Sequence, residues 1–186
     1  EKRESGLFRR KKPAGLNSMS ASRNILLVGC GKMGGAMLRG WLSRGLDTGN
    51  VMVVEPFVEA ADSLKEELSV RVVADMGDIE AGFSPEIVVF AVKPQGMDDI
   101  VPRYADIAAR GAVILSIAAG RNIGYFEKHL GSGSAIVRTM PNTPAAVGRG
   151  ITAASANAHV SDAQRAACEE GAAGGRFPGN NGPFRG

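Results

Sequence analysis

A glycine-rich hexapeptide near the start of the chain has the residue types and spacing that phosphate binding requires. It consists of Gly29, Cys30, Gly31, Lys32, Met33 and Gly34. An apolar run over 24–29 precedes it, and apolar residues recur at helical spacing from 33 to about 44. In a G-x-G-x-x-G turn between a strand and a helix, the first glycine permits the tight turn and the second lets the backbone approach a pyrophosphate. The third lets the helix pack closely against the strand. The segment therefore predicts a dinucleotide-binding loop, the alternative being a strand–helix turn with a structural role alone.

An acidic residue follows this loop at the expected distance. Glu55 ends a second apolar run, 51–54, about twenty residues after the last glycine. A carboxylate there hydrogen-bonds the ribose hydroxyls of an adenosine and repels a 2′-phosphate, which favours NAD over NADP. Arg71 is a base that would shift this balance toward NADP. The alternative interpretation of Glu55 is a surface glutamate before a proline turn.

Two further segments follow predicted strands at the edge where open α/β sheets bind ligands. The first is Ala91, Val92, Lys93, Pro94 and Gln95; the second is Ser116, Ile117, Ala118, Ala119 and Gly120. Lys93 is a candidate contact for ribose, phosphate or a substrate carboxylate. The small residues of the second segment permit close approach of a flat nicotinamide ring. The alternatives are a solvated lysine and a tightly packed loop.

A stiff loop is predicted over 140–145, which reads Met-Pro-Asn-Thr-Pro-Ala. Its two prolines restrict the backbone and hold Asn142 in one orientation. Such a loop orders a carboxamide or a substrate with little entropy loss, whereas the alternative is an ordinary Asx turn.

The elements that must position these residues alternate between strand and helix. Periodicity predicts strands over 24–29, 51–54, 70–74, 87–92, 112–117 and 135–139, and helices over 33–44, 58–68, 96–109 and 122–130. This alternation implies parallel strands joined by right-handed crossovers. We therefore expect an α/β fold with a doubly wound, Rossmann-type, mostly parallel sheet over 23–160. A helix with a good N-cap begins at Ser161-Asp162 and covers about 161–170.

The two ends of the chain differ from this middle. Residues 1–22 contain six of the basic residues and two glutamates. The positive charge of this segment exceeds the net charge of +3 of the whole chain, so the remaining residues are together near neutral. The tail 171–186 is rich in glycine and proline. We expect both to be disordered, and the near-neutral domain to bind no nucleic acid.

The sequence contains no apolar run long enough to cross a membrane and no metal-ligand spacing, so neither a membrane nor a metal is expected. The two cysteines, Cys30 and Cys168, form no disulfide framework, which favours a cytoplasmic location.

The four motifs taken in order resemble the N-terminal domain of pyrroline-5-carboxylate reductases. They are Gly-Cys-Gly-Lys-Met-Gly (29–34), Ala-Val-Lys-Pro-Gln (91–95), Ser-Ile-Ala-Ala-Gly (116–120) and Arg-Thr-Met-Pro-Asn-Thr-Pro-Ala (138–145). The resemblance implies reduction of 1-pyrroline-5-carboxylate, a small molecule, to L-proline with NADPH or NADH. It implies that residues 30–34, Glu55, 91–94 and 117–119 line the cofactor, and that Lys93 and Asn142 are candidates near the nicotinamide.

The chain departs from that family after about residue 170. Family members continue into a helical C-terminal domain that forms the homo-oligomer and contacts substrate, and nothing like it follows here. A second hypothesis is therefore a truncated, non-catalytic nucleotide-binding chain. A third, an oxidoreductase of the hydroxyacid or prephenate type, needs a catalytic lysine or histidine on a C-terminal helix, for which His129 and His159 are poorly placed.

Overall fold

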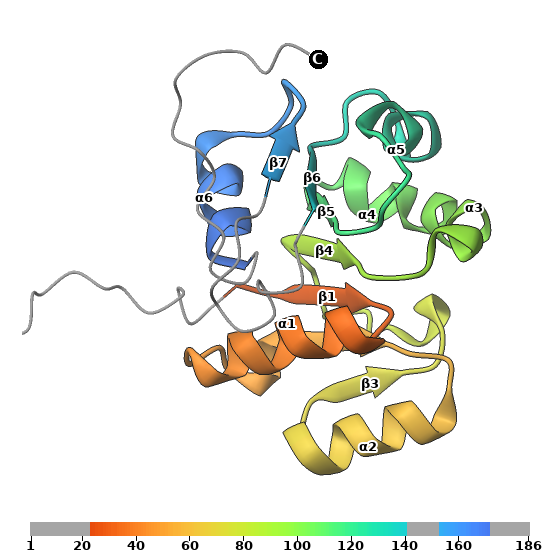
Figure 1. Cartoon of the computed structure of the whole chain (residues 1–186), viewed down its shortest axis with the longest axis vertical. Coiled ribbons are helices and arrows are strands. Elements are labelled where there is room, and N and C mark those ends of the chain that lie inside the picture. Colours follow the sequence, from red (N-terminus) through yellow and green to blue (C-terminus); the bar gives the residue numbers. More distant parts are fainter. Residues whose placement is uncertain (1–22, 141–152, 172–186) are drawn as a thin grey trace, which may run out of the picture.

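A seven-stranded sheet with helices on both faces forms the fold (Figure 1). The structure is a computed structural model, and it describes residues 23–140 and 153–171. The strand order is β3-β2-β1-β4-β5-β6-β7. The strands are β1 (Ile25–Val28), β2 (Val51–Val54), β3 (Arg71–Val73), β4 (Ile87–Phe90), β5 (Val113–Ser116), β6 (Ile136–Met140) and β7 (Ala153–Ala156). The first six pair in parallel and only β7 is antiparallel, to β6, so the predicted doubly wound, mostly parallel sheet is confirmed.

The central strands are buried on both faces, which explains their continuous apolar sequences. Every residue of β1, β2, β4 and β5 is buried. Because successive side chains of a strand point to opposite faces, Leu27 belongs to one core and Leu26 to the other.

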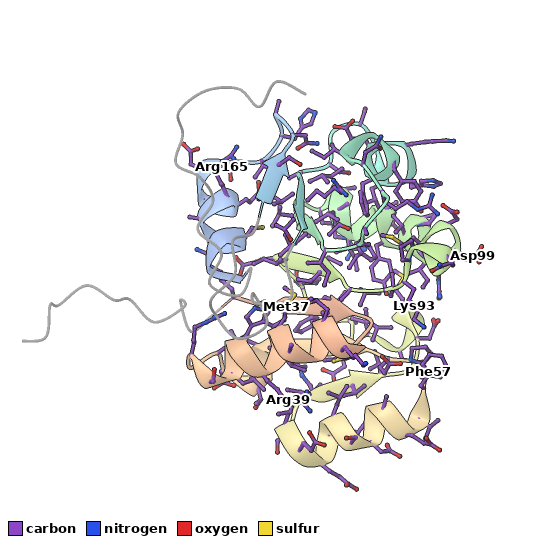
Figure 2. The ribbon with its side chains drawn as sticks, viewed as in Figure 1. Met37, Arg39, Phe57, Lys93, Asp99 and Arg165 are labelled. Atoms are coloured by element: carbon purple, nitrogen blue, oxygen red, sulfur yellow. The ribbon has the colours of Figure 1, made fainter. Side chains whose placement is uncertain are left out.

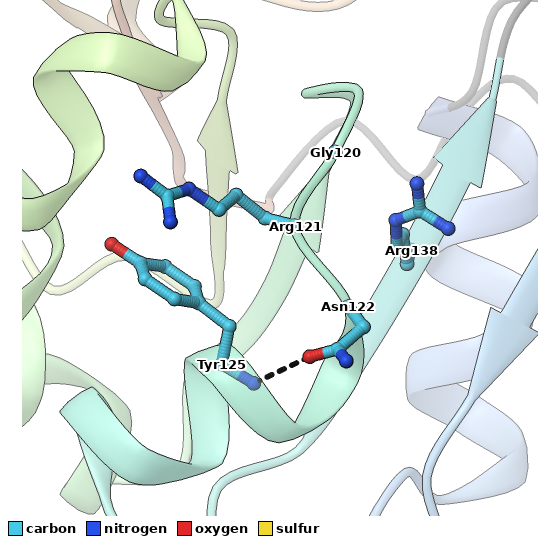
Figure 3. A pocket seen from close by; sticks show the side chains of 5 residues that line it. All are labelled: Gly120, Arg121, Asn122, Tyr125 and Arg138. Carbon is cyan, nitrogen blue, oxygen red and sulfur yellow. Dashed lines mark hydrogen bonds between the residues drawn. The ribbon is translucent and has the colours of Figure 1, made fainter.

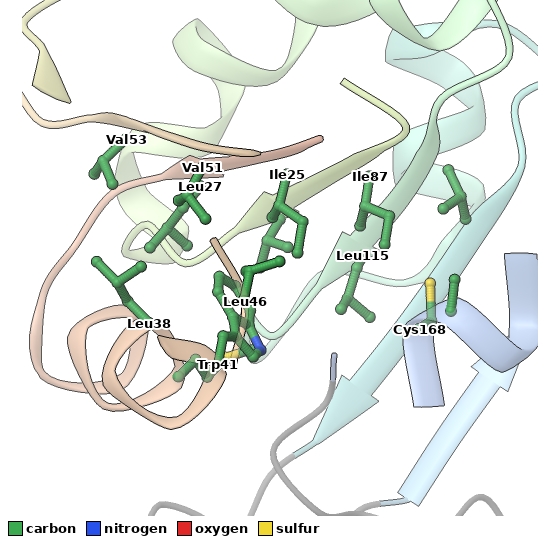
Figure 4. Packing of buried hydrophobic residues seen from close by; sticks show 14 of the residues in the cluster. Ile25, Leu27, Leu38, Trp41, Leu46, Val51, Val53, Ile87, Leu115 and Cys168 are labelled. Carbon is green, nitrogen blue, oxygen red and sulfur yellow. The ribbon is translucent and has the colours of Figure 1, made fainter. Parts of the chain in front are cut away.

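Each face of the sheet packs against its own set of helices. Residues of α1 (Lys32–Ser43), α2 (Val58–Leu68) and α6 (Asp162–Gly171) share one core with Leu27. Residues of α3 (Met97–Ile100), α4 (Ala105–Ala109) and α5 (Ile123–Leu130) share the other. Figure 4 shows the first core, in which Trp41 and Leu38 of α1 lie beneath the strands. Cys168 of α6 belongs to the same core, on the side of β5.

One sequence expectation about the elements was wrong, and one strand was not predicted. The single helix expected over 96–109 is instead α3, a 3-10 helix over Val101–Tyr104, and α4. Pro102 lies in the middle of this stretch; proline has no backbone N–H and its ring clashes with the carbonyl four residues earlier, so the α-helix is interrupted. Strand β7 was not expected, because its sequence Ala-Ala-Ser-Ala lacks the β-branched residues typical of a strand.

The start expected for the last helix is confirmed. The Ser161 hydroxyl accepts from the backbone N–H of Gln164, and the Gln164 side chain accepts from the N–H of Ser161. This reciprocal capping box fixes the beginning of α6 at Asp162. The expectations for 1–22 and 172–186 lie outside the described residues. Among the described helices, none is both long and apolar enough to span a bilayer.

Candidate functional site

The glycine-rich loop joins the end of β1 to the start of α1 and lies directly against the loop that follows β4. Gly29 has φ +82°, in the left-handed region that only glycine adopts freely. A Cβ built on it would lie 2.6 Å from Cγ1 of Val92. Its N–H donates to the Val54 carbonyl at 2.9 Å. The tight turn expected at Gly29 is therefore present, and it holds β1, β2 and the β4 loop together.

The other two glycines differ in their surroundings as the motif requires. A Cβ on Gly34 would lie 2.6 Å from the Gly29 carbonyl oxygen and 3.1 Å from Cβ of Ala91, so only glycine lets α1 pack this closely. A Cβ on Gly31 would meet nothing within 4 Å. The space in front of Gly31 is open, as expected for a position that a ligand approaches.

The N-terminus of α1 offers unpaired donors to that open space. The N-cap is Gly31, which has no side chain to cap the helix, and the first turn contains no acidic residue. The first intrahelical bond runs from the N–H of Gly35 to the carbonyl of Gly31 at 2.8 Å. The preceding amides of Lys32, Met33 and Gly34 have no acceptor within the helix, as in any first turn. A helix end of this kind binds anions well, because the amides and the helix dipole both favour negative charge.

Glu55 is buried beside the loop and holds it in place. The residue is only 5 % exposed, so it is not the surface glutamate of the alternative interpretation. Its Oε2 accepts from the backbone N–H of Cys30 at 2.9 Å, and its Oε1 accepts from the N–H of Phe57 at 3.2 Å. Each carboxylate oxygen can accept a further hydrogen bond. Glu55 therefore connects the end of β2 to the glycine-rich loop and keeps acceptor capacity for a ligand.

The thiol of Cys30 stays protonated at neutral pH. Burial, with a smaller contribution from the Glu55 carboxylate and opposed by Arg39, raises the pKa of Cys30 to about 11. The loop thus carries no thiolate that would repel a phosphate.

The loops after β4 and β5 lie next to one another at the carboxyl edge of the sheet. The N–H of Ala91 donates to the Val28 carbonyl at 2.9 Å, and that of Ile117 donates to the Phe90 carbonyl at 3.2 Å. Lys93 is exposed and precedes the short 3-10 helix that Pro94 begins. Figure 2 shows Lys93 on the same side of the molecule as Phe57, which follows Glu55. The structure therefore brings the glycine-rich loop, Glu55, 91–94 and 117–119 to one edge.

Arg121, which no sequence motif singled out, links these two loops. Its guanidinium donates to the Pro94 carbonyl at 3.1 Å and to Oδ2 of Asp98 at 2.8 Å. The guanidinium also lies over the Tyr125 ring, 4.5 Å from the centroid (Figure 3). The neighbouring Tyr125 phenol, and secondarily the Arg121 guanidinium, lower the pKa of Asp98. Sequence offers no signal for this link, because it joins residues more than twenty positions apart.

Other sequence candidates are not part of this edge. Arg71 begins β3 and bonds to Oε2 of Glu80 and to the Gly49 carbonyl just before β2, at the amino ends of the strands. His129 stacks on Tyr125 in the last turn of α5, and His159 is exposed between β7 and α6. Asn142 lies outside the described residues, and those that are described contain no acidic, histidine or cysteine group suited to a metal.

The fold and this edge together define a dinucleotide-binding domain of the Rossmann type, the class found in many oxidoreductases. Residues 24–120, just over half of the chain, match the family model described as NADP oxidoreductase coenzyme F420-dependent. The chain belongs to this family.

Comparison with individual proteins gives a narrower group of relatives than the family model. The chain is 34% identical over 152 residues to a pyrroline-5-carboxylate reductase of Pseudomonas aeruginosa. The aligned region covers 82% of this chain and 54% of that protein. A Vibrio alginolyticus protein of the same name is 30% identical over 148 residues, covering 80% and 54%. The solved structure of a pyrroline-5-carboxylate reductase from Coxiella burnetii aligns with a TM-score of 0.76 at 30% identity, over 83% of this chain and 58% of that one. The chain thus spans about half the length of the curated relatives it matches.

A structural likeness to a different enzyme shows the fold alone. The prephenate dehydrogenase of Aquifex aeolicus aligns with a TM-score of 0.71 at 16% identity, over 84% of this chain and 59% of that one. It lends no support to the prephenate-type hypothesis beyond the shared architecture.

Proposed function

We propose that this chain binds NADH or NADPH with the pyrophosphate against the N-terminus of α1. The observation that carries the proposal is the contrast between Gly31, whose Cβ position is open, and Gly34, whose Cβ position is filled by the Gly29 carbonyl. The first leaves room for a ligand and the second brings the helix close to the loop. The amides of Lys32, Met33 and Gly34, together with Gly31 and the half-buried Cys30, would line the phosphates.

The adenosine ribose would lie at Glu55. Its buried carboxylate is oriented by the amides of Cys30 and Phe57, and its remaining lone pairs would accept from the ribose hydroxyls. A buried carboxylate repels a 2′-phosphate, and Arg71 is engaged at the opposite ends of the strands. We infer that NADH binds more tightly than NADPH. A reductase from Plasmodium falciparum that aligns at 23% identity was solved with NADP bound, so the binding test includes both nucleotides.

The nicotinamide would lie along 91–94 and 117–119. Ala118 is buried and Ala119 is exposed, so the small side chains leave the backbone accessible at this edge. Lys93, exposed at the end of the β4 loop, would contact ribose, phosphate or the carboxylate of a substrate. Asn142, as in the sequence-based hypothesis, would contact the nicotinamide end.

The reaction that the relatives favour is the reduction of 1-pyrroline-5-carboxylate, a small imino acid, to L-proline. The reduced nicotinamide supplies a hydride, and the protein contributes position and charge. In this chain Lys93 would bind the substrate carboxylate, while the loops joined by Arg121 would hold the ring against it. Neither Cys30 nor Cys168 is joined in a disulfide with a described residue, which fits a reducing compartment such as the cytoplasm.

A second candidate is nucleotide binding without turnover by this chain alone. It is favoured because every candidate cofactor contact except Asn142 lies within the described residues, whereas the chain covers about half the length of its relatives. Titration calorimetry with NADH and NADPH tests the binding, and NADH oxidation on addition of 1-pyrroline-5-carboxylate distinguishes the two candidates.

A matched pair of variants makes the binding test specific. Gly31→Ala places a methyl group in the open space before α1, whereas Gly40→Ala places one on the same helix, also with nothing within 4 Å. We expect Gly31→Ala alone to weaken NADH binding, about tenfold or more for a crowded phosphate contact. Equal affinity for both variants, or no binding by the unaltered chain, would refute the proposal.

A further inference from the structure

A pocket lies beyond the proposed nicotinamide segment, between the β5–α5 loop and β6. It has a volume of about 410 Å³ and is lined by Gly120, Arg121, Asn122, Tyr125 and Arg138. Figure 3 shows Arg121 and Arg138 on opposite sides of the loop that carries Gly120 and Asn122. A pocket of this size is large enough for a small metabolite.

Among the described residues, the lining of this pocket contains hydrogen-bond donors and no carboxylate. The oxygen of Asn122 is already used, because it accepts from the backbone N–H of Tyr125 at 2.9 Å and caps α5. Its amide nitrogen remains a donor. Burial, with the Asp98 carboxylate as a second cause, raises the pKa of Tyr125 to about 12, so its phenol keeps its proton.

The two arginines differ in whether a described carboxylate pairs with them. Arg121 is paired with Asp98 at 2.8 Å and covers the Tyr125 ring. Arg138 has no ion pair with any described residue, and its buried Nε has no hydrogen-bond partner among them. A buried donor without an acceptor costs free energy, and the cost is larger for a charged group. An anion in the pocket would supply the acceptor that this Nε lacks among the described residues.

The backbone fixes Arg138 in this orientation. Arg138 pairs with Ser116 of β5 on one side and with Ser155 of β7 on the other, so the residue is held within the sheet. Its neighbours Val137 and Thr139 are buried on the opposite face. Because side chains alternate along a strand, Arg138 must point to the α5 face, where the pocket lies.

We propose that this pocket binds a small oxyanion, a carboxylate or a phosphate, through Arg138 and the amide of Asn122. A guanidinium presents several donors in a plane and pairs with either oxyanion in a bidentate manner. The site is separate from the glycine-rich loop, so it requires no bound dinucleotide. Its place after 117–119 puts an anion next to the segment proposed to hold the nicotinamide.

Calorimetric titration of the full chain with three probes tests the proposal. L-Proline carries a carboxylate, prolinamide lacks it, and inorganic phosphate represents the other source of an oxyanion. We expect L-proline or phosphate to bind and prolinamide not to bind; whichever anion binds more tightly identifies the preferred class. Absence of binding by both anions at concentrations of tens of millimolar would overturn the proposal.

Variants of Arg138 assign the binding to this pocket. Arg138→Gln should weaken the anion about tenfold or more, as expected for loss of a charge-assisted hydrogen bond. Arg138→Lys should retain part of the affinity. Arg165→Gln removes an exposed arginine of α6 on another side of the molecule and should change nothing (Figure 2). Equal affinity in Arg138→Gln and the unaltered chain would also overturn the proposal.

A spectroscopic readout covers the case in which Arg138→Gln fails to fold. In the unaltered chain, the Nε–Hε resonance of Arg138 should shift on addition of the anion, whereas that of Arg165 should not. If the Arg138 resonance stays in place while the anion binds, the pocket is not its site.

Discussion

The backbone N–H of Cys30 donates to Oε2 of Glu55 at 2.9 Å, which ties the glycine-rich loop to the end of the neighbouring strand. The same carboxylate accepts from Phe57, so one buried side chain organises both segments expected around the adenosine half of a dinucleotide. The relationship gives Glu55 a structural role in the protein without ligand, in addition to the proposed ribose contact.

Replacing Glu55 should therefore destabilise the fold as well as weaken binding. Glu55→Ala removes the acceptor of the partly buried amides of Cys30 and Phe57, and we expect the free energy of unfolding to fall by about 1–3 kcal/mol. Urea denaturation measures this change. Glu66→Ala removes an exposed carboxylate of α2 and should have little effect. Equal losses in the two variants would show that the amides of the loop do not depend on Glu55.

Gly34 should not tolerate even one methyl group. Gly34→Ala forces a Cβ to within 2.6 Å of the Gly29 carbonyl oxygen, so α1 must move away from the loop. We expect a loss of about 1–3 kcal/mol, the usual cost of an added group in a packed region. Gly40→Ala in the same helix meets no atom within 4 Å and should be neutral or stabilising by up to about 1 kcal/mol. A thermal unfolding midpoint for Gly34→Ala at or above that of Gly40→Ala would contradict the close packing.

Cys30 should react slowly with thiol reagents near neutral pH. Its pKa is raised to about 11, so the reactive thiolate is scarce at pH 8 and increases until the pH passes about 11. The rate of iodoacetamide alkylation at Cys30, followed by peptide mass spectrometry over a range of pH, measures this dependence. Glu55→Gln removes a nearby negative charge and should move the midpoint to lower pH. A midpoint near the usual value for a thiol would contradict the effects of burial and of Glu55.

The raised pKa also has a consequence for stability. The folded state holds the Cys30 proton more tightly than the unfolded state, so the protonated thiol contributes to the free energy of unfolding. This contribution is fully present below the ordinary thiol pKa. It is lost as the pH rises from about 9 to about 11. The free energy of unfolding should fall over this range, and the fall should be smaller in Cys30→Ala. An unchanged pH dependence in that variant would show that Cys30 is not the group responsible.

Arg121 should affect the nicotinamide half of the cofactor and leave the adenosine half unchanged. Arg121→Gln breaks the link from the β5 loop to the Pro94 carbonyl and to Asp98, so the two loops are no longer held together. We expect weaker binding of NADH and unchanged binding of ADP-ribose, both measured by calorimetry. Arg103→Gln, which removes an exposed ion pair with Asp75, is the control. Equal weakening of both ligands by Arg121→Gln would indicate a general loss of structure.

The sequence by itself determined the architecture. Apolar runs such as 51–54 and 87–90 can be buried only within a sheet covered on both faces, and their alternation with helical segments requires parallel pairing. The confirmed doubly wound, mostly parallel sheet and the start of α6 at Asp162 follow from such local signals. The glycine-rich loop was also recognisable from the spacing of its glycines, because each of them meets a local steric requirement. Its role as a ligand site, like that of Lys93 and Asn142, remains a prediction.

The tertiary structure decided what depends on neighbours distant in the chain. Pairing with β6 made a strand of the alanine-rich 153–156. The burial of Glu55 between the Cys30 and Phe57 amides, and the link from Arg121 to Pro94, arise from loops that meet only when the sheet assembles. Long-range packing places these groups, and a linear pattern carries no information about the acceptor that a given donor will reach.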